Sequence, residues 1–505
     1  MASKTRDELF FNLGIDVGTS SVKALLAAED ASEMRAASVP CGVNHPEPDC
    51  AEADPEAWWE AAAQAVDSLD CAGVLIRGIG VSTLYPALVL TDAAGRVLRP
   101  AILYCDQRSA AESRELLASF GEERARCVTG NAFPAGTASV TSLLWVRRHE
   151  PDIFARASGI GHAGTFIVEK LTGRRVIDFS SASLTGLYHL ARNDWCDELL
   201  ALAGIRREML PQVLPGGAPA GRLCTAAAQR LDLPAGLPVA AGAGDTVCSA
   251  LGIGVAEPCE LFVIAGSTNC FAALATVPDF DNGLINNCYL DPRTWIGIGA
   301  TSTSGAAVQW FVDTFLSPGD YARFFDLCTR AQPGSGGVVF LPYLAGERTP
   351  CYDPRARGVF FGLTASTSLA DLARSVAEGV CFADRHILES FETGGRGRSI
   401  ESLLAAGGGM RADFMRRLRT DIIGKPIGFS GLTEVAALGA ALLGGIAGGT
   451  YADWREAASI ARKANRFTFL HPDPAAHAGY DAPYATYRQL YPRLKDLFAA
   501  VDHAS

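Results

Sequence analysis

The stretch Asn12-Leu-Gly-Ile-Asp-Val-Gly-Thr-Ser-Ser-Val-Lys23 decides how the rest of the sequence is interpreted. It joins an apolar strand, Phe10 to Ile15, to a second strand, Val22 to Ala27, and therefore predicts a β-hairpin. The turn of this hairpin carries one glycine and two hydroxyl residues: Gly18, Thr19 and Ser20. Backbone N–H groups in such a turn form a concavity that binds anions, and a glycine lets a phosphate come close. We therefore expect a phosphate-binding turn, and the alternative is an ordinary Asp-containing turn that binds nothing.

Asp16 lies between the first strand and this turn. Carboxylate oxygens together with retained water molecules suit Mg²⁺. We therefore expect Asp16 to hold this ion, directly or through water, beside the bound phosphate.

The composition is that of a globular protein and excludes several classes of function. Of the 505 residues, 49% are hydrophobic and 20% are charged, and this length predicts two large domains or three smaller ones. The net charge of −11 argues against a nucleic-acid-binding surface, which needs a basic stripe. No apolar run predicts a membrane span or a signal peptide. The 14 cysteines contain no Cys-x-x-Cys pair, so we expect free thiols and a cytoplasmic location.

Strands and helices are interspersed along the chain, which predicts a mixed α/β architecture. Asp54 followed by Pro55 predicts the start of a helix that ends near Leu69. The segment Leu369 to Phe391 has apolar residues three and four positions apart, which predicts a long helix. Glu434 to Ala447 is rich in alanine and glycine, and we expect a helix that packs closely against its neighbours.

A second informative stretch, Val239 to Gly254, runs from an apolar strand through two glycines into Asp245 and then into a helix of small residues. An acid at a strand-to-helix turn is well placed to face a cleft. Considered alone, Asp245 is more simply explained as the N-cap of that helix.

The opening pattern returns about 250 residues later. Glu260 to Ala265 and Cys270 to Leu274 predict two strands, and the turn between them contains Gly266, Ser267 and Thr268. Two similar hairpins indicate a duplicated architecture with one phosphate-binding turn in each half. We therefore expect an N-terminal domain of residues 1–256 and a C-terminal domain of residues 257–505. The second hairpin lacks an acid at the position of Asp16, so only the first half is expected to hold the metal.

A glycine turn follows a later strand, Leu403 to Ala406, and precedes a helix, Arg411 to Ile423. This order is a common way to seat a nucleotide, because a helix N-terminus attracts anions. The glycines concerned are Gly407, Gly408 and Gly409. No segment has the three glycines of a Rossmann fingerprint or a Walker A run, which argues against a nicotinamide oxidoreductase.

Several stretches together resemble the FGGY family of carbohydrate kinases, and most closely its xylulokinase branch. They are Asp16 to Lys23, Arg96 to Leu103, Phe340 to Pro350 and Gly358 to Leu363. The resemblance implies two actin-like (ribonuclease H-like) ATPase domains that flank a deep cleft. It also implies ATP-dependent transfer of the γ-phosphoryl group to a hydroxyl of a small sugar, with the two lobes closing over their ligands. It is compatible with a homodimer and gives no role to nucleic acid or to a membrane.

The resemblance implies roles for individual residues as well. Asp245 matches the family's catalytic base, which accepts the proton of the attacking hydroxyl. Asp16 would position Mg²⁺ on the phosphates of ATP. Contacts with the nucleotide are implied for Gly18, Thr19, Ser20, Lys23, Gly266, Ser267, Thr268, Gly407, Gly408 and Gly409. Most of the rate enhancement in such transfers comes from positioning and charge stabilisation.

The sugar site departs from the family pattern. Where xylulokinases carry Gln-Met-His-Gly, this chain has Thr83-Leu84-Tyr85-Pro86, and the Arg-Glu pair of glycerol kinases is also missing there. Asp106 matches the family's acid, whereas Thr246 replaces the Asn that follows the base. Sugar contacts are thus implied for Thr83, Leu84, Tyr85, Asp106 and Thr246. Three further departures, whose effect the sequence leaves open, are Ser142 for a Lys, and Met415 and Arg417 for a Trp and a Gln.

These substitutions are expected to change the preferred sugar, because sites that bind substrate hydroxyls discriminate strongly. In the structural alternative, Tyr85 only packs under Pro86. Our leading expectation is a pentulose such as xylulose, and the alternative substrates are ribulose, erythritol or a similar sugar or alditol. A non-catalytic sensor of sugar or nucleotide is the alternative class, but such a module has no need of a base such as Asp245.

Overall fold

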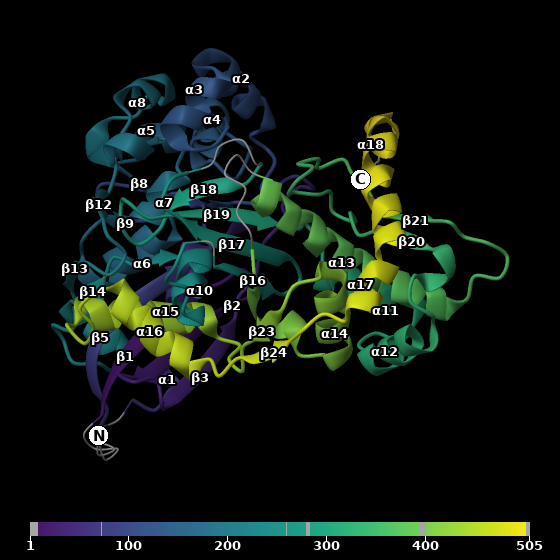
Figure 1. Cartoon of the computed structure of the whole chain (residues 1–505). Coiled ribbons are helices and arrows are strands. Elements are labelled where there is room, and N and C mark those ends of the chain that lie inside the picture. Colours follow the sequence, from purple (N-terminus) through teal and green to yellow (C-terminus); the bar gives the residue numbers. More distant parts are fainter. Residues whose placement is uncertain (1–8, 72, 259, 279–282, 394–399, 501–505) are drawn as a thin grey trace.

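The computed structural model describes residues 9–71, 73–258, 260–278, 283–393 and 400–500. Two seven-stranded sheets form its framework, and helices lie between the sheets and on their outer faces (Figure 1). Among the described residues, no helix combines the length and the apolar character that crossing a membrane requires. Every cysteine that the structure describes is a free thiol.

The first sheet has the strand order β13-β14-β5-β1-β2-β3, with β15 also paired to β5. Its strands are β1 (Phe10–Val17), β2 (Ser21–Ala28), β3 (Met34–Pro40), β5 (Leu75–Thr83), β13 (Pro219–Arg222), β14 (Pro238–Ala240) and β15 (Ala243–Gly244). The strands β1, β5 and β15 run parallel, so their carboxyl ends lie at one edge of the sheet. Ligands of open α/β sheets bind at such an edge.

The second sheet has the order β18-β19-β17-β16-β22-β23-β24. Its strands are β16 (Leu261–Ala265), β17 (Asn269–Ala275), β18 (Ile285–Cys288), β19 (Trp295–Ala300), β22 (Leu403–Ala406), β23 (Ile427–Phe429) and β24 (Thr468–Leu470). Like β1 and β2, the strands β16 and β17 form an antiparallel hairpin, and β16 has a parallel neighbour, β22, as β1 has β5. The predicted repeat of the opening hairpin is therefore confirmed.

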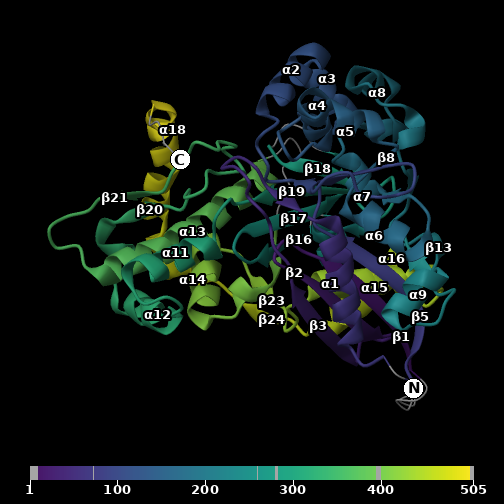
Figure 2. The same cartoon turned by 180° about the vertical axis from the view of Figure 1, so that it is seen from behind.

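Helices cover both faces of each sheet. The helix α1 (Pro55–Asp67) lies on the outer face of the first sheet, in front in Figure 2. Between the sheets lie α10 (Asp245–Ile253), α15 (Val435–Ala447) and α16 (Trp454–Ala464), whose apolar side chains share one core with both sheets. The outer face of the second sheet is covered by α13 (Leu369–Thr393) and α14 (Asp413–Ile423).

The remaining elements extend this framework. Above the first sheet in Figure 1 lie α2 (Ala110–Phe120), α3 (Glu122–Thr129), α4 (Ser139–His149), α5 (Pro151–Arg156) and α8 (Asp197–Ala203). Nearby are α6 (Ala163–Thr172), α7 (Phe179–Ser183), α9 (Thr225–Leu231) and a small sheet of β4 (Glu52–Ala53), β6 (Ala87–Thr91), β7 (Ala101–Leu103) and β8 (Gly159–Gly161). Short strand pairs are β9 (Val176–Asp178) with β12 (Gln212–Leu214), β10 (Tyr188–His189) with β11 (Asp194–Trp195), and β20 (Val339–Leu341) with β21 (Val359–Phe361). Later helices are α11 (Gly305–Phe315), α12 (Tyr321–Arg330), α17 (Pro474–Gly479) and α18 (Asp481–Ala500).

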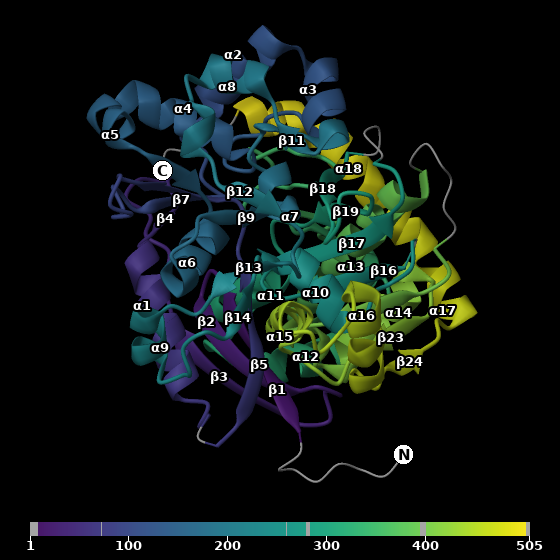
Figure 3. The same cartoon turned by 90° about the vertical axis from the view of Figure 1, so that its left-hand side faces the viewer.

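The helix α15 comes late in the chain but packs on β1 and β5 of the first sheet (Figure 3). A Cβ atom added at Gly80 of β5 would lie 1.9 Å from the carbonyl oxygen of Ala440. A Cβ atom at Gly439 of α15 would lie 1.9 Å from the carbonyl oxygen of Cys248 in α10. Only glycine fits at such distances, so the close packing predicted for this helix is confirmed.

One predicted boundary differs from the structure. The helix expected directly after the three glycines begins at Asp413, because Gly408–Met410 forms a separate 3-10 turn. The N-cap predicted at Asp54 is present, and its carboxylate accepts from the Glu56 N–H.

Candidate active site

The carboxyl ends of β1, β5 and β15 bring the two predicted key acids to one edge of the first sheet. Asp16 is in register with Ser82, and Ser82 is in register with Ala243, two residues before Asp245. The Ser82 hydroxyl donates a 2.7 Å hydrogen bond to Oδ1 of Asp16. Strand pairing, rather than sequence proximity, therefore places both acids beside the same space.

Asp245 is the first residue of α10, and Gly244 is the N-cap residue, so the N-cap explanation of Asp245 does not hold. Its Oδ1 atom accepts hydrogen bonds from the N–H and the hydroxyl of Thr246, at 2.6 and 3.2 Å. Burial and the negative charge of Asp16 raise the pKa of Asp245 to about 7, although the Thr246 hydrogen bonds and the Arg348 charge act in the opposite direction. A carboxyl group with this pKa can accept a proton at neutral pH.

Asp16 is 7% exposed, and burial raises its pKa. Ser82 binds only its Oδ1 atom, and Oδ2 has no hydrogen-bond partner among the described residues. One oxygen of this carboxylate is therefore free to accept a ligand.

The turn of the first hairpin follows β1 directly. Within it the Gly18 N–H donates to the Ser21 carbonyl at 3.0 Å, and Ser20 at its tip is exposed. Lys23 lies on the strand that leaves the turn, where it forms a 2.6 Å ion pair with Glu434 beside the start of α15. This pair joins the first hairpin to the C-terminal half of the chain.

The turn of the second hairpin and the glycine turn lie side by side, because they follow the parallel strands β16 and β22. A Cβ atom on Gly407, which has a φ of +100°, would lie 2.4 Å from the carbonyl oxygen of Ala265, the last residue of β16. The exposed residues at these turns are Gly266, Ser267, Gly408 and Gly409, and Thr268 is half-buried. The predicted nucleotide residues of the C-terminal half are thus adjacent in space.

A contact between the two halves brings the base next to the second hairpin. The Thr246 hydroxyl lies 3.6 Å from the sulfur of Cys270, which follows the turn at the start of β17. Asp245 therefore lies near both hairpins, because its neighbour Thr246 contacts β17 and the charge of Asp16 at the end of β1 acts on its carboxylate.

Tyr85 also lies close to Asp245. Its ring packs against Gly244, where an added Cβ atom would be 2.2 Å from Cε1, and its hydroxyl accepts a 2.9 Å hydrogen bond from Nδ2 of Asn287. Burial and the nearby charge of Asp245 raise the pKa of Tyr85. Tyr85 thus lies close to the predicted base, and its contact with a sugar stays a prediction.

Three other predicted sugar residues are buried within the protein. Thr83 is buried with its hydroxyl near Gly164 of α6, and Leu84 is 1% exposed. Asp106 is fully buried and accepts hydrogen bonds from the Ala51 N–H at 2.7 Å and from the backbone and guanidinium of Arg108. Their contact with substrate stays a prediction.

The structure adds two residues for which the sequence predicted no role. Arg348 donates a hydrogen bond to the carbonyl of Thr301, next to the end of β19, and its positive charge lowers the pKa of Asp245. Asn287 of β18 holds Tyr85. Arg348 lies in the stretch Phe340 to Pro350, which the family resemblance had already singled out. The direction of its side chain, however, depends on a loop that folds back onto β19. No local pattern in the sequence indicates a role for Asn287.

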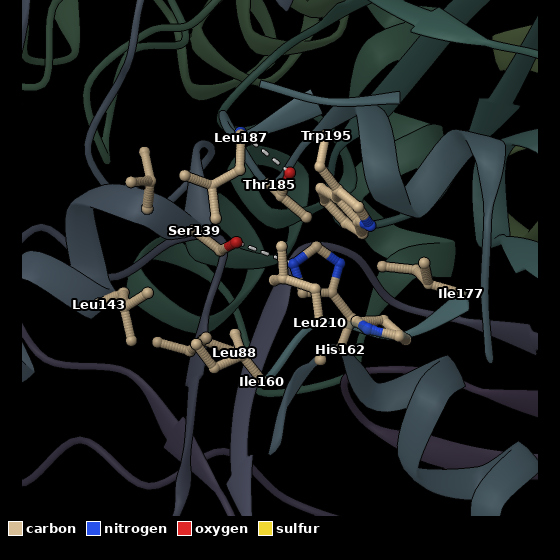
Figure 4. Close-up of a pocket in the computed structure, with 13 residues that line it drawn as sticks. Leu88, Ser139, Leu143, Ile160, His162, Ile177, Thr185, Leu187, Trp195 and Leu210 are labelled. Carbon is tan, nitrogen blue, oxygen red and sulfur yellow. Dashed lines mark hydrogen bonds between the residues drawn. The ribbon is translucent and has the colours of Figure 1, made fainter. Parts of the chain in front are cut away.

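A small cavity, separate from this site, is lined by residues of α4, β6, β8 and β9 and of the loops beside them (Figure 4). Its lining is mostly apolar, and within it Nε2 of His162 is 2.9 Å from the Ser139 hydroxyl. Burial lowers the pKa of His162 to about 3, so this imidazole is neutral. None of the predicted site residues lines the cavity, and we assign it no part in the reaction.

Two hairpin turns, an adjoining glycine turn and a half-buried carboxylate with a pKa near 7 are the features expected of the phosphotransferase class. Comparison with known families gives the particular group. Residues 11–252 match the N-terminal domain and residues 261–448 the C-terminal domain of the FGGY family of carbohydrate kinases. The chain belongs to this family. It is a sugar kinase, a phosphotransferase with an alcohol group as acceptor, and ATP is its phosphoryl donor.

Individual relatives resemble the chain over its whole length. Xylulose kinase of Escherichia coli strain K12 is 31% identical and covers 96% of this chain and 100% of its own. A crystal structure of a xyloylose kinase from Brucella ovis is 34% identical, with a TM-score of 0.87, and covers 96% of this chain and all of that one. Gluconokinase of Bacillus subtilis is 27% identical over 86% of this chain and 87% of its own.

Proposed function

We propose that this chain phosphorylates a pentulose, with xylulose as the leading substrate. The position of Asp245 carries the chemical part of the proposal, because its neighbour Thr246 contacts Cys270 just after the turn of the second hairpin and the pKa of Asp245 is near 7. The choice of sugar rests on the names of the similar proteins from E. coli and B. ovis. At the predicted sugar site, the stretch around Tyr85 replaces the residues that xylulokinases carry there. Ribulose, erythritol and gluconate are therefore the substrates to compare with xylulose. Membership of a kinase family does not favour a non-catalytic sensor.

In the proposed reaction, Asp245 accepts the proton of the sugar hydroxyl as that oxygen attacks the γ-phosphorus. The new bond joins the sugar oxygen to phosphorus, the bond from the γ-phosphorus to the β,γ-bridging oxygen breaks, and ADP leaves. The N–H groups of Gly18 and Gly266 are used within their own turns, so the backbone N–H groups of Thr19, Ser20, Ser267 and Thr268 donate to the phosphate oxygens, and the guanidinium of Arg348 contributes positive charge. Positioning and charge stabilisation of this kind supply most of the rate enhancement in phosphoryl transfer.

The residues at the end of β1 fit a magnesium ion. Mg²⁺ is usually bound by one or two carboxylates, with water and substrate phosphates completing its coordination. Asp16 supplies one such carboxylate oxygen, and the described residues include no group of three or more metal-binding side chains. Asp16 would hold the ion, which when bound would neutralise charge on the phosphates.

The proposal includes a division of the chain at residues 256 and 257 and a cytoplasmic location. Each of the two segments contains one seven-stranded sheet, which supports the division. The free thiols of the described cysteines support a reducing compartment.

The test is ADP release from MgATP in the presence of xylulose, ribulose, erythritol, glycerol or gluconate. We expect xylulose to give the highest kcat/KM, and Asp245→Asn to lower kcat by about 10²–10⁴-fold because a positioned base contributes that much. The same acid-to-amide change at the helix cap, Asp54→Asn, is the control and should leave kcat unchanged. Turnover that survives in Asp245→Asn would remove Asp245 as the base, and a higher kcat/KM for another sugar would replace the substrate.

A further inference from the structure

Asp384 on α13 and Arg419 on α14 form a buried pair of opposite charges. The pair lies beside the turn Gly266–Thr268 and the glycine turn Gly407–Gly409. Arg419 Nε donates to Asp384 Oδ2 at 2.7 Å. Asp384 is 0% and Arg419 1% exposed. The proposed reaction uses neither residue, and no local motif marks either of them.

The other oxygen of Asp384 is connected to the second hairpin. Asn269 Nδ2 donates to Asp384 Oδ1 at 2.7 Å, and Asn269 directly follows Thr268, the last residue of the turn. The backbone of Asn269 is fixed as well, because its N–H donates to the Thr301 hydroxyl at 2.9 Å and its carbonyl accepts from the Thr301 N–H at 3.0 Å. The turn Gly266–Thr268 is therefore anchored to α13 through Asn269, the residue that directly follows it.

The other side of Arg419 is connected to the glycine turn. Its NH1 group donates to the sulfur of Met410 at 3.1 Å. Met410 closes the 3-10 turn that begins at Gly408, and its N–H donates to the Gly407 carbonyl at 3.1 Å. A single ion pair thus contacts the residue that ends each of the two turns.

The energetics of such a pair favour a geometric role over a stabilising one. Burying two charges costs much of what their attraction returns, so a buried ion pair adds little stability compared with apolar side chains of similar volume. Apolar contact is non-directional, whereas charge-assisted hydrogen bonds to a carboxylate fix distance and orientation.

We propose that Asp384 and Arg419 are positioning residues that set the spacing between the turns Gly266–Thr268 and Gly407–Gly409, and thereby the affinity for the nucleotide. This inference rests on the proposed function, because it assumes that the nucleotide binds at these turns. It predicts that loss of the connection weakens nucleotide binding and leaves sugar binding nearly unchanged.

The helix α13 carries a second buried pair that serves as a matched control. Arg374 Nε donates to Glu378 Oε1 at 2.7 Å, and the two residues are 8% and 1% exposed. Glu378 also accepts from the Gly334 N–H and the Ser335 hydroxyl, and Arg374 NH2 donates to the Tyr480 hydroxyl. Glu378→Gln therefore breaks a similar pair in the same helix without touching either turn.

The test uses the full chain and compares Asp384→Asn, Asn269→Ala and Glu378→Gln. The measurements are the Kd of MgADP by calorimetry, the KM for ATP and for the sugar, and the Tm. We expect Asp384→Asn and Asn269→Ala to raise the Kd of MgADP and the KM for ATP roughly tenfold, since small misplacements of binding groups cost that much or more. The KM for the sugar should change by less than about twofold. Glu378→Gln should lower the Tm and leave every binding constant unchanged.

Asn269→Ala leaves the ion pair intact, so it provides the answer if Asp384→Asn does not fold. The double variant Asp384→Leu with Arg419→Met should keep the Tm but lose nucleotide affinity, because apolar replacement of a buried pair preserves stability. Equal effects of Asp384→Asn and Glu378→Gln on the Kd of MgADP, or none from Asn269→Ala, would overturn the inference. If the unaltered protein does not bind MgADP at all, the proposed nucleotide site fails, and this inference fails with it.

Discussion

Asp245 has a pKa near 7, raised by burial and by the charge of Asp16, which gives the enzyme a characteristic pH dependence. The base works as a carboxylate, so kcat/KM should rise with pH through an apparent pKa near 7 and level off above it. Glu347 is also buried, and its pKa is raised to about 7. A pH–rate profile of Glu347→Gln distinguishes the two groups, because the rise persists in this variant only if Asp245 is the group that titrates.

The same ionisation should affect stability. The folded-state pKa of Asp245 lies above its value of about 3.9 in the unfolded chain, so the folded protein binds more protons between roughly pH 4 and 7. The free energy of unfolding therefore falls as pH rises through this window. Asp245→Asn removes that loss, and its Tm should exceed that of the parent by more at pH 8 than at pH 5. A difference in Tm that is independent of pH would contradict the burial of a titrating Asp245.

Arg348 should act on Asp245 through its charge. Because this guanidinium lowers the pKa of Asp245, Arg348→Met should move the rise in kcat/KM to higher pH and lower the activity several-fold at pH 7. Arg348→Lys keeps the charge and should restore the position of the rise. Arg355→Met, on the same loop with an exposed side chain, is the matched control and should leave the profile unchanged. An unshifted profile in Arg348→Met would show that Arg348 has no electrostatic contact with the base.

At the scale of elements, α15 depends on glycine to reach its neighbours. An added Cβ atom at Gly439 would lie 1.9 Å from backbone of α10, so neither helix can accommodate it without moving. We expect Gly439→Ala to reduce the free energy of unfolding by about 1–3 kcal/mol or more, as overpacking does. Gly479→Ala, whose added Cβ atom meets nothing within 4 Å, is the control. Urea unfolding of the two variants measures the difference, and equal midpoints would contradict the close packing.

The sequence predicted those elements whose signals are local. The hairpins at residues 10–28 and 261–275 have turn residues between apolar strands, and the cap of α1 lies in two adjacent residues, so each could be found without knowledge of the fold. The late start of α14 could not be predicted, because the preceding 3-10 turn is held by packing of Gly407 and Gly409 on Ala265, far away in the sequence.

The same difference between local and long-range signals applies to the residues of the candidate site. Asp16 was singled out because it follows an apolar strand and precedes a glycine turn, whereas Asp245, which considered alone suggested an N-cap, was assigned as the base only through the resemblance to the family. Asn287 and the pair Asp384 and Arg419 were missed, because each gains its meaning from partners more than 30 residues away, as Asn269 does for Asp384. Long-range partners of this kind leave no periodic pattern in a single sequence.

At the scale of the whole molecule, the two halves share one hydrophobic core. Apolar residues of β2, α10, α15 and the second sheet belong to a single cluster. We therefore expect one cooperative thermal transition for the full chain, and no stable fold for a fragment of residues 1–256, whose inner sheet face would lack α15. Circular dichroism melting of the fragment tests this expectation, and coexpression with residues 257–505 should restore the fold. A fragment that melts cooperatively near the Tm of the full chain would show that its sheet is stable without α15.

The place of α15 also has a consequence for synthesis on the ribosome. The end of α10 and the start of α15 are separated by roughly 180 residues, which take ~10–40 s to add at about 5–20 residues per second. For that time the nascent chain presents the face of β1 and β5 that α15 later covers. The first half to be translated is thus completed by one of the last helices, and we expect the growing polypeptide to expose this face of the sheet until that helix emerges.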